Sequence, residues 1–366
     1  MASRISPYVD NTGLVFAYDQ ANIVRSYLGE PTVNLVTNGN FSNSKTGWSF
    51  TNVANSATSV GNYQGRNALF ANGLQYYNES PGYFYQSISV TQGVQYTVSF
   101  KYYLLSGTLL FDPDGAYNGG GGLTQSGQWV NYSATFTAST TSLTLNFYGA
   151  SGVPAYYYIT DIQLEAKSHA TQFVNGTRSA TQGLKDLTGR STIDLTNVSF
   201  DGNAQMVFDG TDDTIPIGTV GGYSSNITCE SVFRTTGGAS WKNMISGGCG
   251  DILFTVNGNV LNFGAQCSSP IPHANYSNTV VNTGAWFHAV ATYNGSLVKI
   301  YINGVLENTY ARSGSFTPGA LRVGSASSGA SEFFQGDLPL LKVYNRALTA
   351  SEIQQNFNAI KGRYGL

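Results

Sequence analysis

The chain has 366 residues and is almost uncharged, because its 18 basic and 20 acidic residues make up only 10% of it, against about 25% in an ordinary soluble domain. The net charge of −2 and the absence of long basic runs exclude a nucleic-acid binder, and no apolar run reaches the roughly 18 residues that a membrane-spanning helix needs. With 43 Gly, 24 Tyr and 20 Phe, the composition favours a β-sheet protein with many turns.

Strand patterns follow one another along the chain. Residues 13–20 (GLVFAYDQ) predict an opening strand, and Tyr96–Leu104 alternates between apolar and polar residues. Such alternation is typical of antiparallel sandwiches with one face toward the core. Asn303 and Gly304 predict a type I′ hairpin, because that turn needs positive φ at both central residues. Further strands are predicted around residues 128–136, 143–147, 205–209, 226–234, 251–263, 286–293, 297–303, 320–324 and 337–344.

One helix is predicted, at about residues 350–361. Thr349 followed by Glu352 forms the sequence of a capping box, in which each residue satisfies a free backbone N–H group of the first turn. Gly362 is the expected left-handed residue that ends the helix. Its apolar face is expected to consist of Ile353, Phe357 and Ile360, packed on the edge of the sandwich.

A polar, turn-rich stretch, Glu165–Gly183, predicts a boundary between two sandwiches. Ahead of it, residues 33–167 form a self-contained alternating unit, and residues 168–183 are interpreted as a linker. The fold class that follows is all-β, with two antiparallel sandwiches and a short C-terminal helix.

The cysteine count is odd, since Cys229, Cys249 and Cys267 are the only three. Their spacing fits no metal site and predicts no disulfide framework. We expect buried free thiols in a protein made in a reducing cytosol, with a single Cys249–Cys267 bridge as the alternative. The N-terminal sequence shows no apolar segment of the kind that a secretory signal needs.

The C-terminal part carries an ordered series of motifs. In this order they resemble the laminin-G-like, concanavalin A-like jelly rolls, and the resemblance covers most of residues 184–366. GLVFAYD near residue 13 resembles the strand that opens these domains. The resemblance therefore implies a jelly roll that begins within residues 1–32 and resumes at 184–366, with a second module inserted after its first strand. The motifs are Phe208–Asp213, Trp286–Gly295, Val298–Gly304, Leu321–Gly324, Phe334–Gly336 and Val343–Ile353.

The insert, residues 33–167, resembles the carbohydrate-binding jelly rolls that accompany glycanases and adhesins. That family often holds a structural calcium between its first and last strands, and Asp161 falls at its terminal acid. Asn40 and Ser42 stand where acids are common in the opening motif, so the calcium affinity expected here is much weaker. The motifs that carry the resemblance are Leu35–Phe41 with Gly47-Trp48, Tyr85–Val90, Gly93–Phe100, Trp129–Phe136 and Ile159–Glu165.

Nearly the whole chain, including residues 161–179 and 344–366, resembles virion structural proteins of tailed bacteriophages, notably those of marine and cyanobacterial hosts. The resemblance implies a protein made in the host cytoplasm and exposed on the virion surface. Its expected partners are capsid or tail proteins and further copies of itself, such as a trimer, with no nucleic acid and no membrane. Tail fibre, baseplate appendage and capsid decoration stay open as locations.

The acidic clusters do not predict an enzyme. A glycosidase needs two carboxylates roughly 5 to 9 Å apart, and no strand places two acids side by side on one face. Asp112 and Asp114 belong to a turn sequence, and Asp209, Asp212 and Asp213 lie in the structural turn of the family motif.

The histidines lack catalytic partners in the sequence. His169, His273 and His288 lie far apart, and His288, beside Trp286, is expected to pack or to form hydrogen bonds. No nucleophile elbow or phosphate loop is present. The chain is therefore expected to be non-enzymatic, with no catalytic residues and a glycan hydrolase as the least favoured alternative.

Aromatic and amide side chains predict a glycan-binding surface, because sugars present CH faces to rings and hydroxyls to amides. The same tyrosines would also suit contacts between identical subunits, so a purely structural decoration or tail protein remains the competing hypothesis. The candidate glycan-binding residues are Tyr76, Tyr77, Tyr83, Tyr85, Gln86, Asn146, Tyr148 and Trp241.

Overall fold

The computed structural model describes residues 11–52, 58–74, 82–113, 122–124, 127–150, 153–236, 241–268 and 271–366. They form antiparallel sheets, so the predicted all-β class with a C-terminal helix is confirmed. The chain divides into two compact units. One unit, here the flanking unit, comprises Met1–Pro31, Ser179–Asp201 and Gln205–Leu366, and the other, here the inserted unit, comprises Thr32–Arg178 with Gly202–Ala204.

The larger sheet of the flanking unit has eight strands. Its order is β13-β14-β25-β16-β21-β22-β23, and β1 also pairs with β25, so the strand that precedes the insert joins strands that follow it. The strands are β1 (Leu14–Asp19), β13 (Ser199–Phe200), β14 (Met206–Asp209), β16 (Ile227–Thr236), β21 (Thr283–Tyr293), β22 (Leu297–Ile302), β23 (Val305–Ala311) and β25 (Gln335–Tyr344).

A second sheet of six strands completes this sandwich, in the order β15-β24-β17-β18-β19-β20. Apolar side chains of both sheets, among them Phe233 and Phe254, form one buried core. The short helix α1 (Ala180–Gly183) precedes these strands, and a 3₁₀ turn covers Gln266–Ser268. The six strands are β15 (Ile215–Gly218), β17 (Lys242–Ser246), β18 (Ile252–Asn257), β19 (Val260–Ala265), β20 (Tyr276–Val280) and β24 (Leu321–Val323).

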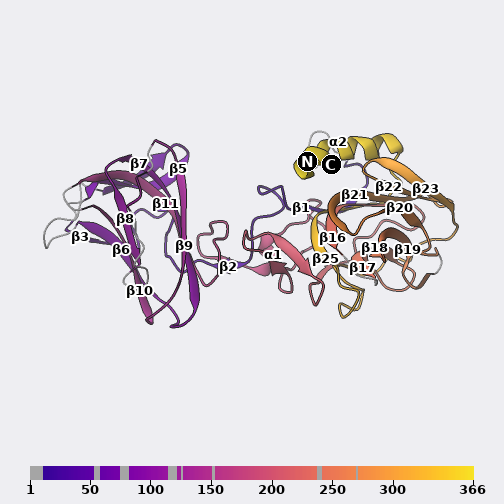
Figure 1. Ribbon diagram of the computed structural model, residues 1–366, viewed down its shortest axis with the longest axis horizontal. Helices are drawn as coiled ribbons and strands as arrows, with labels where there is room; N and C mark the ends of the chain where they lie inside the picture. The colour runs from indigo at the N-terminus through magenta and orange to yellow at the C-terminus, as the bar shows by residue number, and fades with distance from the viewer. Residues whose placement is uncertain are drawn as a thin grey trace. The chain divides into compact units, whose positions relative to one another are not determined.

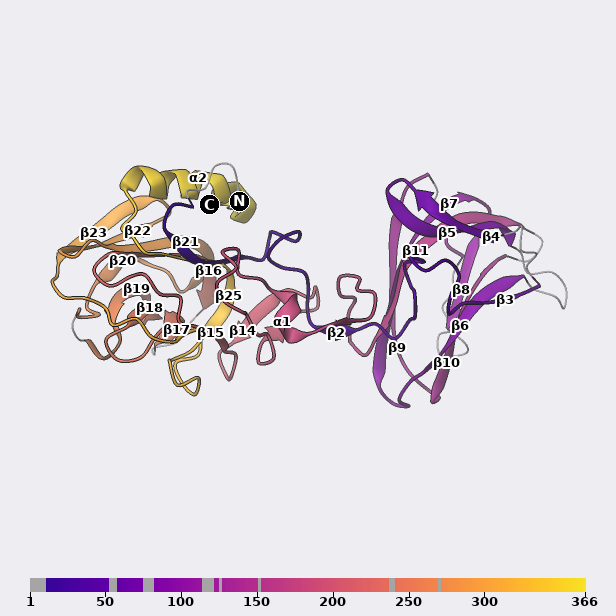
Figure 2. The ribbon, with the colours of Figure 1, turned by 180° about the vertical axis from the view of Figure 1, so that it is seen from behind.

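Helix α2 (Ala350–Tyr364) covers the face of the larger sheet that is turned away from β17, β18 and β19 (Figures 1 and 2). The predicted capping box is present, since the Thr349 side chain accepts a hydrogen bond from the Glu352 N–H group. The predicted end is wrong: Gly362 lies inside the helix, and Gly365 is the left-handed cap, with φ of 69°. Ile353 and Ile360 are buried as predicted, whereas Phe357 is only half-buried and Asn356 is buried.

The predicted hairpin turn is confirmed. Asn303 and Gly304 join β22 to β23, and their φ angles are 51° and 79°. A type I′ turn needs positive φ at both central residues, and this requirement is the reason why Asn-Gly predicts the turn.

The inserted unit is a second sandwich, with sheets β3-β6-β10-β8 and β4-β5-β11-β7-β9. Inward-facing rings fill its core, and those of Phe84 and Phe147 stack with centroids 5.0 Å apart. Its strands are β3 (Ser49–Thr51), β4 (Thr58–Tyr63), β5 (Arg66–Leu74), β6 (Tyr83–Ser89), β7 (Gln95–Ser106), β8 (Leu109–Pro113), β9 (Val130–Thr137), β10 (Ser142–Gly149) and β11 (Ala155–Glu165).

The chain enters and leaves the inserted unit through two short paired strands. Strand β2 (Thr32–Val33) pairs antiparallel with β12 (Thr177–Arg178). The residues interpreted as a linker, 168–183, are divided: those up to Arg178 belong to the inserted unit, and those from Ser179 belong to the flanking unit.

The expectation of free thiols is wrong for two of the three cysteines. Cys249 and Cys267 form a disulfide, with Cα atoms 5.1 Å apart, and only Cys229 is a buried free thiol. This is the bridge that the sequence left open as the alternative, and it forms because the two cysteines lie at the two ends of the β18-β19 hairpin, which brings them together.

Among the described residues, no helix is long and apolar enough to cross a membrane.

Candidate functional site

Four of the predicted glycan-binding residues lie together on the outer face of the four-stranded sheet. Cross-strand pairing places Tyr85 opposite Asn146 and Tyr83 opposite Tyr148. All four side chains are half-buried, while the residues that alternate with them on β6 and β10 are buried in the core. The rings of Tyr83 and Tyr85 have centroids 5.5 Å apart. The alternation therefore assembles a small aromatic and amide surface, as the sequence predicts.

Gln86 does not belong to this surface, and its assignment as a ligand-binding residue is corrected. Its side chain points to the opposite face of the sheet and is 7% exposed. The amide accepts a hydrogen bond from Thr37 N–H at 2.7 Å and donates to the carbonyl oxygens of Thr37 and Gly47 at 3.0 and 2.9 Å. Gln86 thus holds the loop that precedes β3.

The remaining candidates are separate from that surface. Trp241 belongs to the flanking unit, where its half-buried ring contacts that of His273 edge-on at 4.8 Å. Tyr76 and Tyr77 lie outside the described residues.

A larger group of rings lies on the outer face of the five-stranded sheet. We call it the five-ring patch. Tyr63 and Tyr158 stack nearly parallel with centroids 3.7 Å apart, and Phe70 stacks on Tyr158 at 4.8 Å. Tyr103 and Trp129 meet Tyr63 edge-on at 5.2 and 6.2 Å. All five rings are half-buried, so each keeps part of its surface in contact with solvent.

Strand pairing explains why these rings meet. Tyr158 of β11 lies opposite Phe70 of β5 on one side and opposite Tyr103 of β7 on the other. A tight turn at Gln64-Gly65, with φ of 48° and 82°, returns the chain so that Tyr63 faces Arg66. Sequence reasoning missed this patch because its members come from five separate segments, and only pairing between distant strands places them on one face.

Desolvation, together with the Tyr103 hydroxyl, raises the pKa of Tyr63 above its ordinary value. At neutral pH its phenol therefore keeps its proton and can donate a hydrogen bond.

Charged side chains border the five-ring patch. Asp161 Oδ2 lies 3.1 Å from Arg66 Nη1 and 2.9 Å from Lys101 Nζ. The Arg66 guanidinium also lies over the Trp129 ring, 5.9 Å from its centroid. The Trp129 Nε1 atom is buried and has no hydrogen-bond partner among the described residues. The border thus offers charged groups beside aromatic faces.

The surroundings of Asp161 do not fit a calcium ion. The residue has a φ of 53° at an irregularity in β11, and its carboxylate faces two cations. A hard divalent cation needs several oxygen ligands with surplus negative charge, whereas this carboxylate is already neutralised. Asp161 is therefore better suited to its two ion pairs than to a calcium ion.

The aspartates of the family turn act structurally. Asp209, Asp212 and Asp213 lie close enough for carboxylate oxygens to meet within 4.8 Å. Asp213, however, is buried and accepts hydrogen bonds from the N–H groups of Ser199 and Asp209. Burial raises the pKa of its carboxyl group and outweighs these hydrogen bonds, which act to lower that pKa. The hydrogen bonds to Asp213 thus fix a turn. Asp114, of the other acidic pair, lies outside the described residues.

A buried ionic network lies between the larger sheet and α2. Glu230 Oε1 is 2.9 Å from Lys342 Nζ and 3.2 Å from His288 Nε2, and Asn356 of α2 donates to Oε2 at 2.7 Å. Burial works to raise the pKa of Glu230, but Lys342 and His288 outweigh it and lower that pKa to about 2. His288 also stacks on Phe357, so its expected packing and hydrogen-bonding role is confirmed. The four hydrogen-bonded side chains of this network are at most 1% exposed and cannot reach a substrate: Glu230, His288, Lys342 and Asn356.

Two segments match known protein families. Residues 33–155 match the family described as a carbohydrate binding domain, and residues 209–354 match the concanavalin A-like lectin/glucanases superfamily. The matches support both jelly-roll descriptions made from the sequence. No curated protein matches the chain.

The solved structures that match parts of this chain do so with low sequence identity and low TM-scores. The botulinum neurotoxin type G receptor binding domain is 16% identical, with a TM-score of 0.37 over 50% of each chain. Domain 4 of the arabinanase AbnA from Geobacillus stearothermophilus, in complex with arabinotriose, is 16% identical, with a TM-score of 0.35 over 49% of this chain and 92% of that one. The Ruminococcus gnavus sialidase CBM40 bound to sialyllactose is 13% identical, with a TM-score of 0.32 over 36% of this chain and 82% of that one. The chain spans about half the length of the first of these structures.

Proposed function

We propose that this chain is a non-enzymatic, glycan-binding surface protein of a tailed-phage virion, and that the five-ring patch is its glycan-binding site. The observation that carries the proposal is the cluster of five half-buried rings, bordered by Arg66, Lys101 and Asp161, on one face of the inserted unit. The match of residues 33–155 to a carbohydrate binding domain family supports it. The virion setting rests on the sequence resemblance alone.

The chemistry of the patch suits a sugar. Pyranose rings stack their CH faces on aromatic rings, which supplies most of the affinity without any charge. The Tyr63 hydroxyl can donate a hydrogen bond to a sugar oxygen, and the Asp161 carboxylate can accept hydrogen bonds from sugar hydroxyl groups. A polysaccharide of the host surface is the proposed ligand class.

The test compares the two outer faces of the same sandwich. Trp129→Ala removes a ring from the five-ring patch, and Tyr85→Ala removes a ring from the surface that the sequence predicts. We expect Trp129→Ala to weaken binding to a bacterial polysaccharide array about tenfold and Tyr85→Ala to leave it unchanged, with thermal unfolding of both variants as the control for folding.

Two outcomes would contradict the proposal in different ways. Loss of binding in Tyr85→Ala alone would place the site on the four-stranded sheet and retain the glycan function. No binding by the wild-type chain to any glycan at millimolar concentration would overturn the glycan function itself. The aromatic surfaces would then be contacts between copies of the chain, as in a structural capsid decoration or tail protein, and light scattering would report the oligomer.

A further inference from the structure

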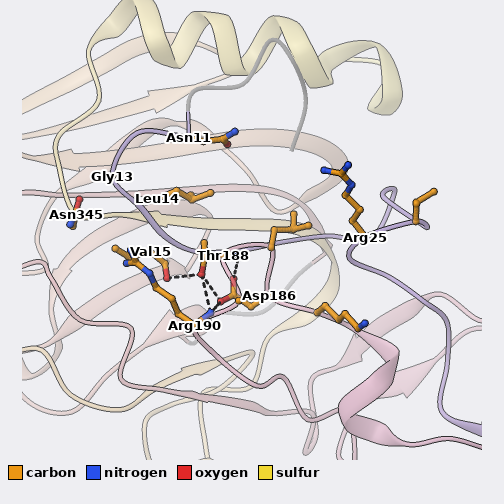
Figure 3. Close-up of a pocket in the computed structure, with 13 residues that line it drawn as sticks. Asn11, Gly13, Leu14, Val15, Arg25, Asp186, Thr188, Arg190 and Asn345 are labelled. Atoms are coloured by element: carbon orange, nitrogen blue, oxygen red, sulfur yellow. Dashed lines mark hydrogen bonds between the residues drawn. The ribbon is translucent and has the colours of Figure 1, made fainter. Parts of the chain in front are cut away.

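A pocket of about 660 Å³ lies in the flanking unit, between the loop that follows β1 and the loop that follows α1 (Figure 3). Three basic side chains, Arg25, Lys185 and Arg190, line it. Its apolar lining is aliphatic, from Leu14 and its neighbours, and no aromatic ring takes part among the described residues. The pocket therefore differs in kind from the five-ring patch.

The two loops that carry the cations are fixed to one another. Ser26 and Lys185 exchange two hydrogen bonds, since Lys185 N–H donates to Ser26 O at 2.9 Å and Ser26 Oγ donates to Lys185 O at 3.0 Å. Asp19 N–H donates to Ser26 Oγ at 3.0 Å. The backbone next to Arg25 is thus fixed to that of Lys185 through the buried Ser26, so both basic side chains extend from a preformed frame.

The one acidic side chain in the pocket is engaged within the fold and forms no ion pair with these cations, so three cations and one carboxylate leave a positively charged lining. Asp186 is 7% exposed and accepts hydrogen bonds on both oxygens from within the fold. Oδ1 accepts from the N–H groups of Ala17 and Thr188, each at 3.0 Å, and Oδ2 accepts from Thr188 Oγ1 at 2.6 Å and from the N–H groups of Arg190 and Ser191 at 2.9 and 3.0 Å. The carboxylate shapes the loop that presents Arg190.

The three cationic groups have no ion-pair partner among the described residues. Elsewhere among the described residues of the two units, Arg66, Lys101 and Lys342 are each paired with a carboxylate. In a protein with only 18 basic residues, three unpaired ones on one pocket are a concentrated positive charge.

We propose that this pocket binds an acidic saccharide, with sugar carboxylates on Arg25, Lys185 and Arg190. Figure 3 shows Arg25 and Arg190 apart, with Asp186 between them, so a ligand that reaches both is extended and carries more than one anionic group. The volume lies within the range of small-molecule sites, far above that of a single inorganic anion. Asn345 and the buried, unpartnered Oδ1 atom of Asn11 line the same pocket and provide hydrogen-bonding groups for sugar hydroxyls.

This site is independent of the proposed function, because it lies in the other unit and selects charge instead of aromatic stacking. The absence of rings leaves a neutral sugar little to bind, whereas guanidinium groups form paired, charge-assisted hydrogen bonds to carboxylates.

The experiment measures binding of the full chain to oligogalacturonate by calorimetry at low and high salt. The double variant Arg25→Gln/Arg190→Gln removes two cations of the pocket, and Lys299→Gln/Lys361→Gln removes two cations outside it. We expect affinity for oligogalacturonate to fall at least tenfold in the pocket variant and to stay unchanged in the control, and we expect added salt to weaken binding by the wild type.

Three outcomes would overturn the proposal: equal binding by the pocket and control variants, equal binding of the methyl-esterified, neutral oligosaccharide, or equal affinity for inorganic sulfate. The third would show a site for small anions that does not recognise sugars. Because both arginines are exposed, their replacement leaves the fold intact, and thermal unfolding of the variants checks this. Retained binding by Trp129→Ala separates this pocket from the five-ring patch.

Discussion

Among the residues that the structure describes, each unit buries one glutamate completely, and the two units satisfy it in opposite ways. Glu230 of the flanking unit lies against Lys342 and His288. Glu165 of the inserted unit is equally buried but accepts hydrogen bonds from uncharged donors: Thr32 Oγ1, Gln163 Nε2 and the N–H and Oγ1 groups of Thr171, at 2.6 to 2.9 Å. One carboxylate is held by charge and the other by a ring of hydroxyl and amide groups.

The difference shows how a chain with little charge distributes it. The flanking unit uses an ionic network to attach a helix, since Asn356 of α2 also donates to Glu230. In the inserted unit, Arg66 and Lys101 pair with Asp161 beside the five-ring patch, and the buried Arg178 donates to the carbonyl oxygens of Gln172 and Phe173. A buried charge pair is costly to break, whereas neutral donors tolerate the loss of charge better.

The largest expected effect follows from removing the charge of Glu230. Glu230→Gln leaves Lys342 buried without a counter-charge, and we expect the free energy of unfolding to fall by about 3–5 kcal/mol. Glu165→Gln, the matched change in the other unit, should cost about 1–3 kcal/mol because its donors are neutral. Urea denaturation of both variants measures the difference, and equal losses would contradict the comparison.

The dependence of stability on pH should sharpen the same contrast. The folded-state pKa of Glu230 is about 2, below its ordinary value of 4.5, so its contribution is fully present above pH 4.5 and is lost as the pH falls toward 2. Burial raises the pKa values of Asp213 and Asp251, which act in the opposite direction. The wild type should therefore lose more stability between pH 4.5 and 2 than Glu230→Gln does, and parallel curves would disprove this assignment.

Removal of the disulfide should have a smaller effect. Cys249 and Cys267 are 18 residues apart, and a bridge across a loop of about that length contributes roughly 3 kcal/mol by restricting the unfolded chain. We expect Cys249→Ser/Cys267→Ser to lower the melting temperature of the flanking unit. Cys229→Ser, which changes the buried free thiol, serves as the comparison without loss of a cross-link.

The smallest expected effect concerns the cap of α2. Thr349→Ala removes the acceptor for the Glu352 N–H group, and we expect a loss of about 1 kcal/mol in thermal unfolding. Glycan binding by the inserted unit should not change, and a change would show that α2 influences that unit.

Local features could be predicted from the sequence because neighbouring residues determine them. The Asn303-Gly304 hairpin needs only two residues that accept positive φ, and the capping box at Thr349 needs only residues three apart. Alternation within residues 143–148 likewise puts Asn146 and Tyr148 on one face, and in the structure they lie opposite Tyr85 and Tyr83.

Features that depend on pairing between distant strands could not be predicted. Tyr63 and Tyr158 stack with ring centroids 3.7 Å apart although many residues separate them in the sequence. Gln86 was misassigned because it was grouped with its sequence neighbour Tyr85, whereas alternation along β6 turns it to the opposite, buried face, where it holds a loop. The end of α2 was placed at Gly362, although the helix continues to the next glycine.

The paired strands β2 and β12 have a consequence for how such a protein can change. Because the entering and leaving strands run side by side, the inserted unit occupies a single position in the chain without separating β1 from its partner β25. A recombination event that replaced residues 32–178 would therefore exchange this sandwich, and with it the proposed five-ring glycan site, while the pairing of β1 with β25 stayed intact.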